Sequence, residues 1–366
     1  MLPVPVMKPR LPSAERLASY LAAIDASRVY TNFGPLALAL EERLAAHFGL
    51  PGGTVVTVAN ATVGLTLALA AQGARPGTLC AIPAWTFVAS AHAAVMAGLV
   101  PFFVDVDPRT DTLEPRAMAD VARNAPAELG AVMPVSVFGQ PLDVAAWDLW
   151  PSRSRVPTAI DAAAGFDSVV PGATPAVVSL HATKVLGAGE GGFVVSRDTA
   201  LIREIRTRAN FGFRGSRQAL VAGTNAKLSE YHAAVGHAAL DEWQEARAEW
   251  LAVAQQYRSA LSTSDDVRLQ PEFGKTWVTS TCVLHFRAPA ADAAERALDR
   301  AEIGTRRWWG GGAHAHPATE VYPRAPLPVT EILAASTLGV PFSRDLAVSD
   351  IGRITSIVLA NARRSS

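Results

Sequence analysis

Lys184 is the residue of this sequence best suited to covalent chemistry. It is the one lysine in the stretch AVVSLHATKVLGAGEGG (residues 176–192), between a β-branched run that ends at Ser179 and a glycine-rich turn. A lysine among apolar and small neighbours loses solvation of its charged form, so its pKa falls and the neutral amine can attack a carbonyl group. The stretch therefore predicts a nucleophilic lysine. A surface lysine in a loop that follows a strand is the alternative.

A carboxylate at the end of an earlier strand is a second candidate for this chemistry. Residues 156–161 (VPTAID) are predicted to form a buried strand that ends in Asp161, and small residues follow it. Ligands of α/β sheets bind at the carboxyl ends of the strands. If Lys184 carries pyridoxal phosphate, Asp161 would keep the pyridine nitrogen protonated, so that the ring can act as an electron sink. A helix cap is the alternative role of Asp161.

A helix start earlier in the chain is a candidate phosphate site. Residues 54–58 are predicted to form a strand, and Asn60, Ala61 and Thr62 lead into an apolar helix that ends at Ala71. The first amides of a helix are free to donate hydrogen bonds, and the helix dipole favours an anion there. An ordinary turn between a strand and a helix is the alternative.

The elements that must position these residues follow an α/β pattern. Short apolar strands alternate with helical stretches to about residue 200, which predicts a mostly parallel sheet with helices on both faces. Ser13 and Pro35 are predicted to start the first two helices, and residues 229–258 to form one long helix. Residues 1–12 hold four prolines and are predicted to form an extended arm.

The alternating pattern weakens from about residue 251, which predicts a second domain. Residues 277–286 are predicted to form one of its strands. We therefore expect an N-terminal arm and a large cofactor-binding domain in residues 1–250, and a small C-terminal α+β domain in residues 251–366.

The composition excludes several classes of protein. The 366 residues include 33 basic and 33 acidic side chains, so no basic field favours nucleic acid or an anionic membrane. Cys80 and Cys282 have no spacing typical of a metal site or of disulfides. The N-terminus has no apolar run of signal length, and no stretch approaches about 18 apolar residues. The sequence thus predicts a soluble, cytoplasmic protein without a metal ion.

Four blocks of the sequence together resemble the DegT/DnrJ/StrS family of sugar-nucleotide aminotransferases. They are SLHATKVLGAGEGG, IDAAAGFD, PAWTFVASAHAAVMAGLVPFFVDVDP and YTNFGPLALALEERLAAHFG. The resemblance covers most of the chain and weakens towards the C-terminus. It implies the aspartate-aminotransferase-like fold (fold type I), the cofactor pyridoxal phosphate with its pyridoxamine form, and a homodimer with shared active sites.

The resemblance also implies roles for residues of the cofactor site. Lys184 and Asp161 would be catalytic, and Lys184 would carry the cofactor and shuttle a proton. Phe87 would cover the ring face, with Trp85 ranked lower. Further cofactor contacts implied by the resemblance are the phosphate-binding residues Ala61, Thr62 and Ser179, and Asn225, which would reach the phosphate of the neighbouring subunit.

Two positions depart from the pattern of the family. Ala61 stands where the family usually has a glycine, which limits φ but keeps the backbone donors. Ala164 stands where the family commonly places glutamine or histidine near the phenolic oxygen of the cofactor. That contact is either absent or supplied by another residue.

Candidate substrate-binding residues lie in two segments. The stretch GTRRWWGGGAH (residues 304–314) combines cations, indoles and glycines, which suits a loop that grips an anionic, ring-containing ligand such as a sugar nucleotide. A surface loop with a tryptophan anchor is the alternative. In the family, the segment around NFGP lies near the active site. The candidates are Asn32, Phe33, Gly34, Arg306, Trp308, Trp309 and His314.

The resemblance implies an enzyme of amino-sugar biosynthesis, a sugar aminotransferase. It would move an amino group from an amino acid, L-glutamate by resemblance, to C4 of a nucleotide-linked 4-keto-6-deoxyhexose. Amination at C3 of a sugar nucleotide, amination of a ketose or cyclitol, and a non-catalytic regulatory protein of the same fold stay open. A related branch has histidine in place of the lysine and performs dehydration, and Lys184 argues against that branch.

Overall fold

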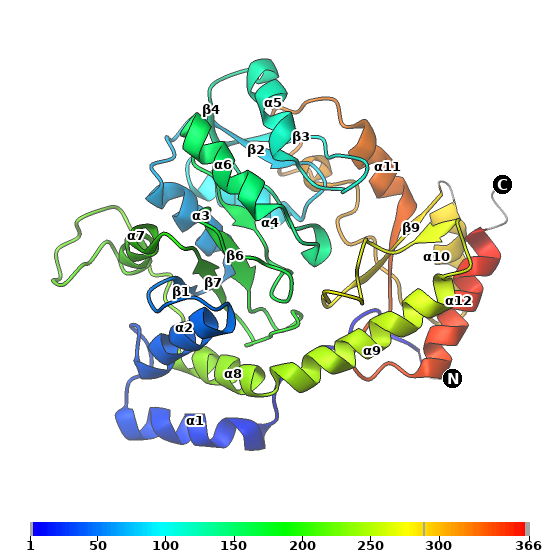
Figure 1. Ribbon diagram of the computed structural model, residues 1–366, viewed down its shortest axis with the longest axis horizontal. Helices are drawn as coiled ribbons and strands as arrows, with labels where there is room; N and C mark the ends of the chain where they lie inside the picture. The colour runs from blue at the N-terminus through cyan, green and yellow to red at the C-terminus, as the bar shows by residue number, and fades with distance from the viewer. Residues whose placement is uncertain (1–2, 288–289, 363–366) are drawn as a thin grey trace.

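The computed structural model, which describes residues 3–287 and 290–362, is built around a central sheet in the first part of the chain (Figure 1). One group of strands has the order β3, β2, β4, and the other has the order β5, β6, β7, β1. Parallel bridges from Val132 to Thr158 and from Val135 to Asp161 join β4 to β5. β7 is antiparallel to β6 and β1, and the other paired strands are parallel. The strands are β1 (Val55–Val58), β2 (Leu79–Pro83), β3 (Val100–Val104), β4 (Leu129–Val132), β5 (Ile160–Asp161), β6 (Ala176–Ser179) and β7 (Gly192–Val195).

Helices cover both faces of this sheet, as the sequence predicts. Successive strand residues point to opposite faces, so Val177 and Val178 belong to different cores. Val177 packs with α3 (Ala61–Ala71), α4 (Val88–Met96) and α7 (Thr199–Ala209). Val178 belongs to the core that includes α2 (Pro35–His47), α5 (Met118–Asn124), α6 (Val144–Ser154) and α8 (Glu230–Asp241). The predicted mostly parallel sheet between helices is confirmed.

Local signals set the starts of the first two helices. The Ser13 hydroxyl accepts a hydrogen bond from the Arg16 amide and caps α1 (Ala14–Ser27). Pro35 is the first residue of α2. The single helix predicted for residues 229–258 is wrong, because Glu242 has φ −90° and ψ −1° and separates α8 from α9 (Trp243–Leu261).

The C-terminal part of the chain forms a second sheet with its own core. Its antiparallel strands have the order β10 (Thr337–Val340), β9 (Cys282–Phe286), β8 (Val267–Arg268). Of the strand predicted over residues 277–286, only Cys282–Phe286 is a strand. α9, α10 (Ala290–Arg300) and α12 (Val348–Ala362) pack in this core, which draws on Trp250 and later residues and on Val4 (Figure 1). The domain boundary at residue 250 stays a prediction.

The N-terminal arm lies against the C-terminal part of the chain. Parallel bridges join Val4 to Ile303 and Met7 to Phe342. α11 (Pro328–Ser336) connects the second sheet back to β3, because the Asp105 carboxylate accepts hydrogen bonds from the Val329 and Thr330 amides. These contacts fasten the two sheets to one another.

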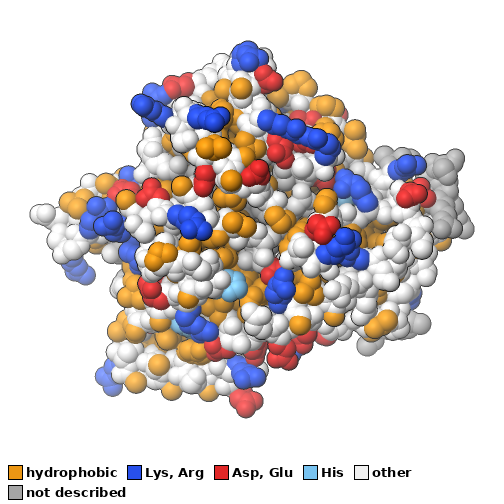
Figure 2. Space-filling model, viewed as in Figure 1, with side chains coloured by type: hydrophobic (Ala, Val, Ile, Leu, Met, Phe, Trp, Pro, Cys, Tyr) orange, Lys and Arg blue, Asp and Glu red, His pale blue; other side chains and the backbone are white. Residues whose placement is uncertain are grey.

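The surface carries mixed charge. Lysine and arginine side chains alternate with aspartate and glutamate on the face seen in Figure 2. Within the described ranges, none of the helices is long and apolar enough to cross a membrane. The short 3-10 turns that complete the fold are η1 (Pro115–Ala117), η2 (Val137–Gly139) and η3 (Ala313–Ala315).

Candidate active site

A cavity of about 500 Å³ lies at the carboxyl ends of β5 and β6, between the two sheets. The arm contributes Met7 to its wall, and the C-terminal part contributes Ser280 and Thr281. The cavity brings together nine residues singled out from the sequence: Ala61, Thr62, Phe87, Asp161, Ser179, Lys184, Arg306, Trp308 and Trp309.

Asp161 is a buried carboxylate with room for one more donor. The Ser90 hydroxyl donates to Oδ2 at 2.6 Å, and the Ala163 amide donates to Oδ1 at 3.1 Å. Burial raises the pKa of Asp161, whereas these hydrogen bonds and the charge of Lys184 lower it. A carboxylate oxygen can accept two hydrogen bonds, so a cationic N–H in the cavity could pair with it. The pyridinium nitrogen of pyridoxal phosphate is such a group.

Lys184 follows β6 and shares the cavity with Asp161. Burial lowers the pKa of the Lys184 amine, and the charge of Asp161 partly opposes this shift. A lowered pKa increases the neutral fraction of the amine, which is the form that attacks a carbonyl group.

The start of α3 provides free donors for a phosphate. Asn60 caps the helix by accepting a hydrogen bond from the Val63 amide at 2.9 Å. The amides of Ala61 and Thr62 have no acceptor within the helix, because no helical turn precedes them. A Cβ atom at Gly192 would lie 2.9 Å from the Ala61 nitrogen, so only glycine lets β7 approach this closely. Ala61 has no positive φ, and its methyl group therefore fits without strain.

Aromatic side chains form one wall of the cavity. The Trp309 ring stacks on Phe138 with centroids 3.8 Å apart. Trp85 contacts both rings edge-on and is itself almost fully buried, so it supports the wall from behind. Phe87 has 56% of its surface exposed and lines the cavity. This arrangement leaves Phe87, and not Trp85, free to cover a ring.

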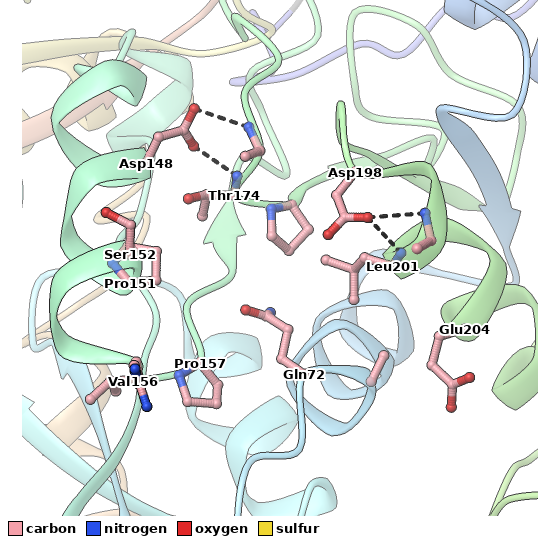
Figure 3. A pocket seen from close by; sticks show the side chains of 15 residues that line it. Gln72, Asp148, Pro151, Ser152, Val156, Pro157, Thr174, Asp198, Leu201 and Glu204 are labelled. Carbon is pink, nitrogen blue, oxygen red and sulfur yellow. Dashed lines mark hydrogen bonds between the residues drawn. The ribbon is translucent and has the colours of Figure 1, made fainter.

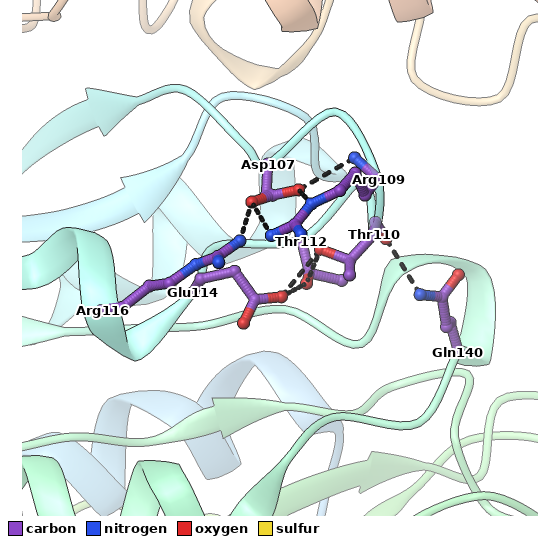
Figure 4. Close-up of polar contacts among 7 residues, drawn as sticks. All are labelled: Asp107, Arg109, Thr110, Thr112, Glu114, Arg116 and Gln140. Atoms are coloured by element: carbon purple, nitrogen blue, oxygen red, sulfur yellow. Dashed lines mark hydrogen bonds and ion pairs between the residues drawn. The ribbon is translucent and has the colours of Figure 1, made fainter.

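A polar network holds the Phe138 turn in place. Phe138 has φ 50°, and the Ser136 hydroxyl donates to the Gln140 carbonyl at 2.7 Å. Gln140 in turn donates to the Thr110 carbonyl at 2.9 Å (Figure 4). The Thr110 loop is braced by Asp107, which pairs with Arg109 and with Arg116 in the same view. The wall is therefore anchored to the loop that follows β3.

Arg306 brings a positive charge to the cavity. Its guanidinium lies 5.0 Å from the centre of the Trp308 ring, and it has no ion pair within the described part of the chain. The adjacent Arg307 pairs with Asp292 and Glu295 instead. Arg306 is thus available to an anionic ligand.

Five of the sequence candidates lie outside this cavity. Phe33 packs beneath the Arg206 guanidinium at 4.7 Å, and Gly34 adjoins the Glu230 side chain. His314 is buried near the Phe103 ring. Asn32 lines a separate hollow, and Asn225 is bridged to a residue that lines the same hollow, Asn210. The roles of these five residues stay predictions.

Several residues that line the cavity carried no usable signal in the sequence. His181 and Glu190 flank Lys184 and lie 3.7 Å apart, but their spacing alone gave them no role. Phe138, Ser280 and Thr281 reach the cavity only through the tertiary fold. Among the described residues, no group of three or more His, Cys, Asp or Glu could hold a metal ion.

A second hollow, of about 530 Å³, lies at the amino ends of β5 and β6 (Figure 3). Both aspartates that line it already accept hydrogen bonds from backbone amides. Asp148 accepts hydrogen bonds from the amides of Ala173 and Thr174, and Asp198 caps α7. The hollow lacks a nucleophile with a perturbed pKa, so the chemistry is expected at the opposite edge of the sheet.

Comparisons with known proteins agree with this site. A sequence model of the DegT/DnrJ/EryC1/StrS aminotransferase family matches residues 13–359. Protein Rv3402c of Mycobacterium tuberculosis is 30% identical, over 97% of this chain and 89% of that protein. The dTDP-4-amino-4,6-dideoxy-D-glucose transaminase of Shigella dysenteriae is 33% identical over 64% of each chain. The crystal structure of DesI in the presence of its TDP-sugar product superposes with a TM-score of 0.87 and 30% identity, and covers 99% of this chain and 94% of that chain. The fold predicted from the resemblance is confirmed.

Proposed function

The chain belongs to the DegT/DnrJ/EryC1/StrS aminotransferase family and is a pyridoxal-phosphate-dependent enzyme, and from this premise we propose that it aminates a keto-sugar carried on a nucleotide. The proposed acceptor is a nucleotide-linked 4-keto-6-deoxyhexose, aminated at C4, and the proposed donor is L-glutamate. The name of the Shigella transaminase specifies a 4-amino-4,6-dideoxyglucose on dTDP, and DesI was crystallised with a TDP-sugar product; both support this choice of substrate.

The observation that carries the proposal is the meeting of Lys184 and Asp161 in one cavity, with the free amides of α3 in its wall. Pyridoxal phosphate supplies an aldehyde that holds the amino group and a ring that accepts electrons from the donor Cα. Lys184 Nζ is the base that takes the proton from that Cα. Asp161 Oδ keeps a proton on the ring nitrogen. The Ala61 and Thr62 amides, with the Ser179 hydroxyl, bind the phosphate.

The small-domain side of the cavity suits the rest of the substrate. The Arg306 guanidinium has no ion pair with any residue that the structure describes, and it can form charge-assisted hydrogen bonds with a diphosphate. Trp308 and Trp309 offer flat apolar surfaces for a sugar or a base. Four more residues would reach the substrate only in the assembled dimer or after their loops move: Asn32, Phe33, Gly34 and His314.

The proposal includes a homodimer in the cytoplasm. Asn225 would complete the phosphate site of the neighbouring subunit from the loop between α7 and α8, which extends away from the body (Figure 1). Cys80 and Cys282 are free and buried, which suits a reducing compartment. Sedimentation of the purified chain tests the dimer.

Product analysis tests the substrate. The enzyme with cofactor and glutamate is offered dTDP-4-keto-6-deoxyglucose, the matching 3-keto sugar nucleotide and a free keto-cyclitol. We expect an amino sugar nucleotide only from the 4-keto compound. Exclusive amination of either other acceptor would replace the proposed substrate. No product from any acceptor, together with a bound cofactor that glutamate leaves unchanged, would favour a non-catalytic regulatory protein.

A further inference from the structure

The loop that carries Lys184 presents two more polar side chains to the cavity. His181 and Glu190 both line it, and 45% and 61% of their side-chain surfaces are exposed, so a ligand in the cavity can reach them. The chemistry assigned to Lys184 and Asp161 makes no use of either side chain. Their arrangement indicates a separate role in binding.

The backbone of this loop holds the two side chains opposite one another. Two hydrogen bonds flank them, from the Leu180 amide to the Gly191 carbonyl at 2.9 Å and from the Ala182 amide to the Gly189 carbonyl at 2.8 Å. Gly189 and Gly191 have φ of 91° and 149°, which glycine adopts without strain. The Lys184 amide donates to the His181 carbonyl at 2.9 Å, so the same loop fixes the pair next to the reactive lysine.

Contacts within the loop determine which nitrogen of His181 carries a proton. The Thr183 amide donates to His181 Nδ1 at 3.2 Å, and the Thr183 hydroxyl lies 2.8 Å from the same nitrogen. A ring nitrogen that accepts a hydrogen bond from an amide has no proton of its own, so the proton of the neutral ring is on Nε2. The Nε2 atom of His181 is therefore a hydrogen-bond donor.

This donor and the Glu190 carboxylate leave room for one oxygen atom of a ligand. His181 Nε2 lies 3.7 Å from Glu190 Oε1, which is too far for a direct hydrogen bond. In the part of the chain that the structure describes, Glu190 has no lysine or arginine partner. An oxygen about 2.8 Å from both atoms could accept a hydrogen bond from Nε2 and donate one to the carboxylate. A hydroxyl group does both.

The charge of the pair favours a neutral hydroxyl over a phosphate. A carboxylate without a cationic partner repels a phosphate, and the cavity offers the Arg306 guanidinium to that group instead. We propose that His181 Nε2 and the Glu190 carboxylate together bind one ring hydroxyl of the acceptor sugar and so select acceptors that carry it. The inference rests on the proposed function and names the part of the substrate that this wall recognises.

The test compares kcat/KM for dTDP-4-keto-6-deoxyglucose with the values for its 2-deoxy and 3-deoxy counterparts, using the full-length enzyme with cofactor and glutamate. We expect the wild type to lose roughly ten-fold to a hundred-fold with one of the two deoxy acceptors, because the pair is then left without its hydroxyl. H181F and E190A are expected to show a similar loss with the parent acceptor and no further loss with that deoxy acceptor. H181Q keeps an N–H donor and should recover part of the activity.

A second readout and two controls separate this contact from a general loss of structure. Glutamate has no hydroxyl, so H181F and E190A should slow its conversion of the cofactor far less than transfer to the sugar. H92F and E15A, on exposed positions of α4 and α1 outside the cavity, should keep the wild-type preference among the acceptors.

Three results would overturn the assignment. They are a wild type that does not distinguish the three acceptors, variants H181F and E190A that keep the wild-type preference, and an equal slowing of both half-reactions in these variants. Failure of the wild type to aminate any of the three acceptors would instead overturn the proposed function, and the assignment with it.

Discussion

At the scale of single residues, the site depends on two groups whose pKa values move away from their ordinary range. Burial lowers the pKa of Lys184 and raises that of Asp161, while the opposite charges of the two groups act against both shifts. These shifts are typical of groups that react or hold a charged ligand. The two side chains are therefore the first targets for substitution.

Asp161→Asn tests the ring partner. Asparagine keeps the shape but cannot hold a proton on the ring nitrogen, so kcat is expected to fall by about 10²–10³-fold while cofactor still binds. Steady-state kinetics and dialysis measure the two effects. Asp25→Asn, on an exposed position of α1, is the matched control and should leave kcat unchanged. A D161N enzyme with wild-type kcat would remove Asp161 from the chemistry.

Arg306→Met tests the anion contact. Loss of the Arg306 guanidinium is expected to raise KM for the sugar nucleotide about ten-fold or more, because a charge-assisted hydrogen bond is lost, with a smaller change in kcat. Arg306→Lys keeps the charge and should recover part of the loss. An unchanged KM in R306M would place the diphosphate elsewhere.

At the scale of elements, the cap of α3 is expected to affect both the stability of the fold and the binding of the cofactor. Asn60→Ala removes the acceptor of the Val63 amide, which is expected to lower the free energy of unfolding by about 1 kcal/mol and to weaken retention of the cofactor. Ser13→Ala removes the cap of α1, and because Ser13 does not line the cavity this change should affect stability alone. Chemical denaturation and dialysis compare the two variants. Equal retention of the cofactor in both would contradict the role of α3.

Elements set by local signals were predictable from the sequence, and contacts made across the chain were not. Pro35 starts α2, and Asp161 ends a strand, because each depends on its own neighbourhood. The same is true of the turn before α3. Thr281 and Phe138 belong to segments whose approach to Lys184 depends on how the two sheets dock. Glu242 ends a helix that continues in the hydrophobic pattern, so the break between α8 and α9 was missed.

At the scale of the whole molecule, the two sheets are joined by polar contacts outside the cavity. Asp111, in the loop after β3, faces His285 on β9, with His285 Nδ1 3.6 Å from Asp111 Oδ2. Arg268 on β8 also reaches Asp111, and Thr337 on β10 is the strand partner of His285. Burial, reinforced by the charge of Arg268, lowers the pKa of His285 to about 3.

The burial of His285 predicts sensitivity to acid. A histidine with a lowered pKa in the fold takes up its proton more readily in the unfolded chain. Stability is therefore full above the ordinary pKa of about 6.5 and falls towards a pH of about 3 by about 1.4 kcal/mol per pH unit. His285→Leu removes the titrating group, so its midpoint of thermal unfolding should drop less between pH 7 and pH 5 than that of the wild type. Equal drops would contradict the assignment.

The measurement that tests the central claim most directly is the absorbance spectrum of the protein with pyridoxal phosphate, before and after addition of glutamate. We expect a band at the edge of the visible range that glutamate converts to the band of pyridoxamine phosphate, and we expect no such band in Lys184→Ala. Lys275→Ala, on an exposed lysine paired with Glu272, is the control and should behave as the wild type. An unaltered band and normal turnover in K184A would contradict the role of Lys184 and the account built on it.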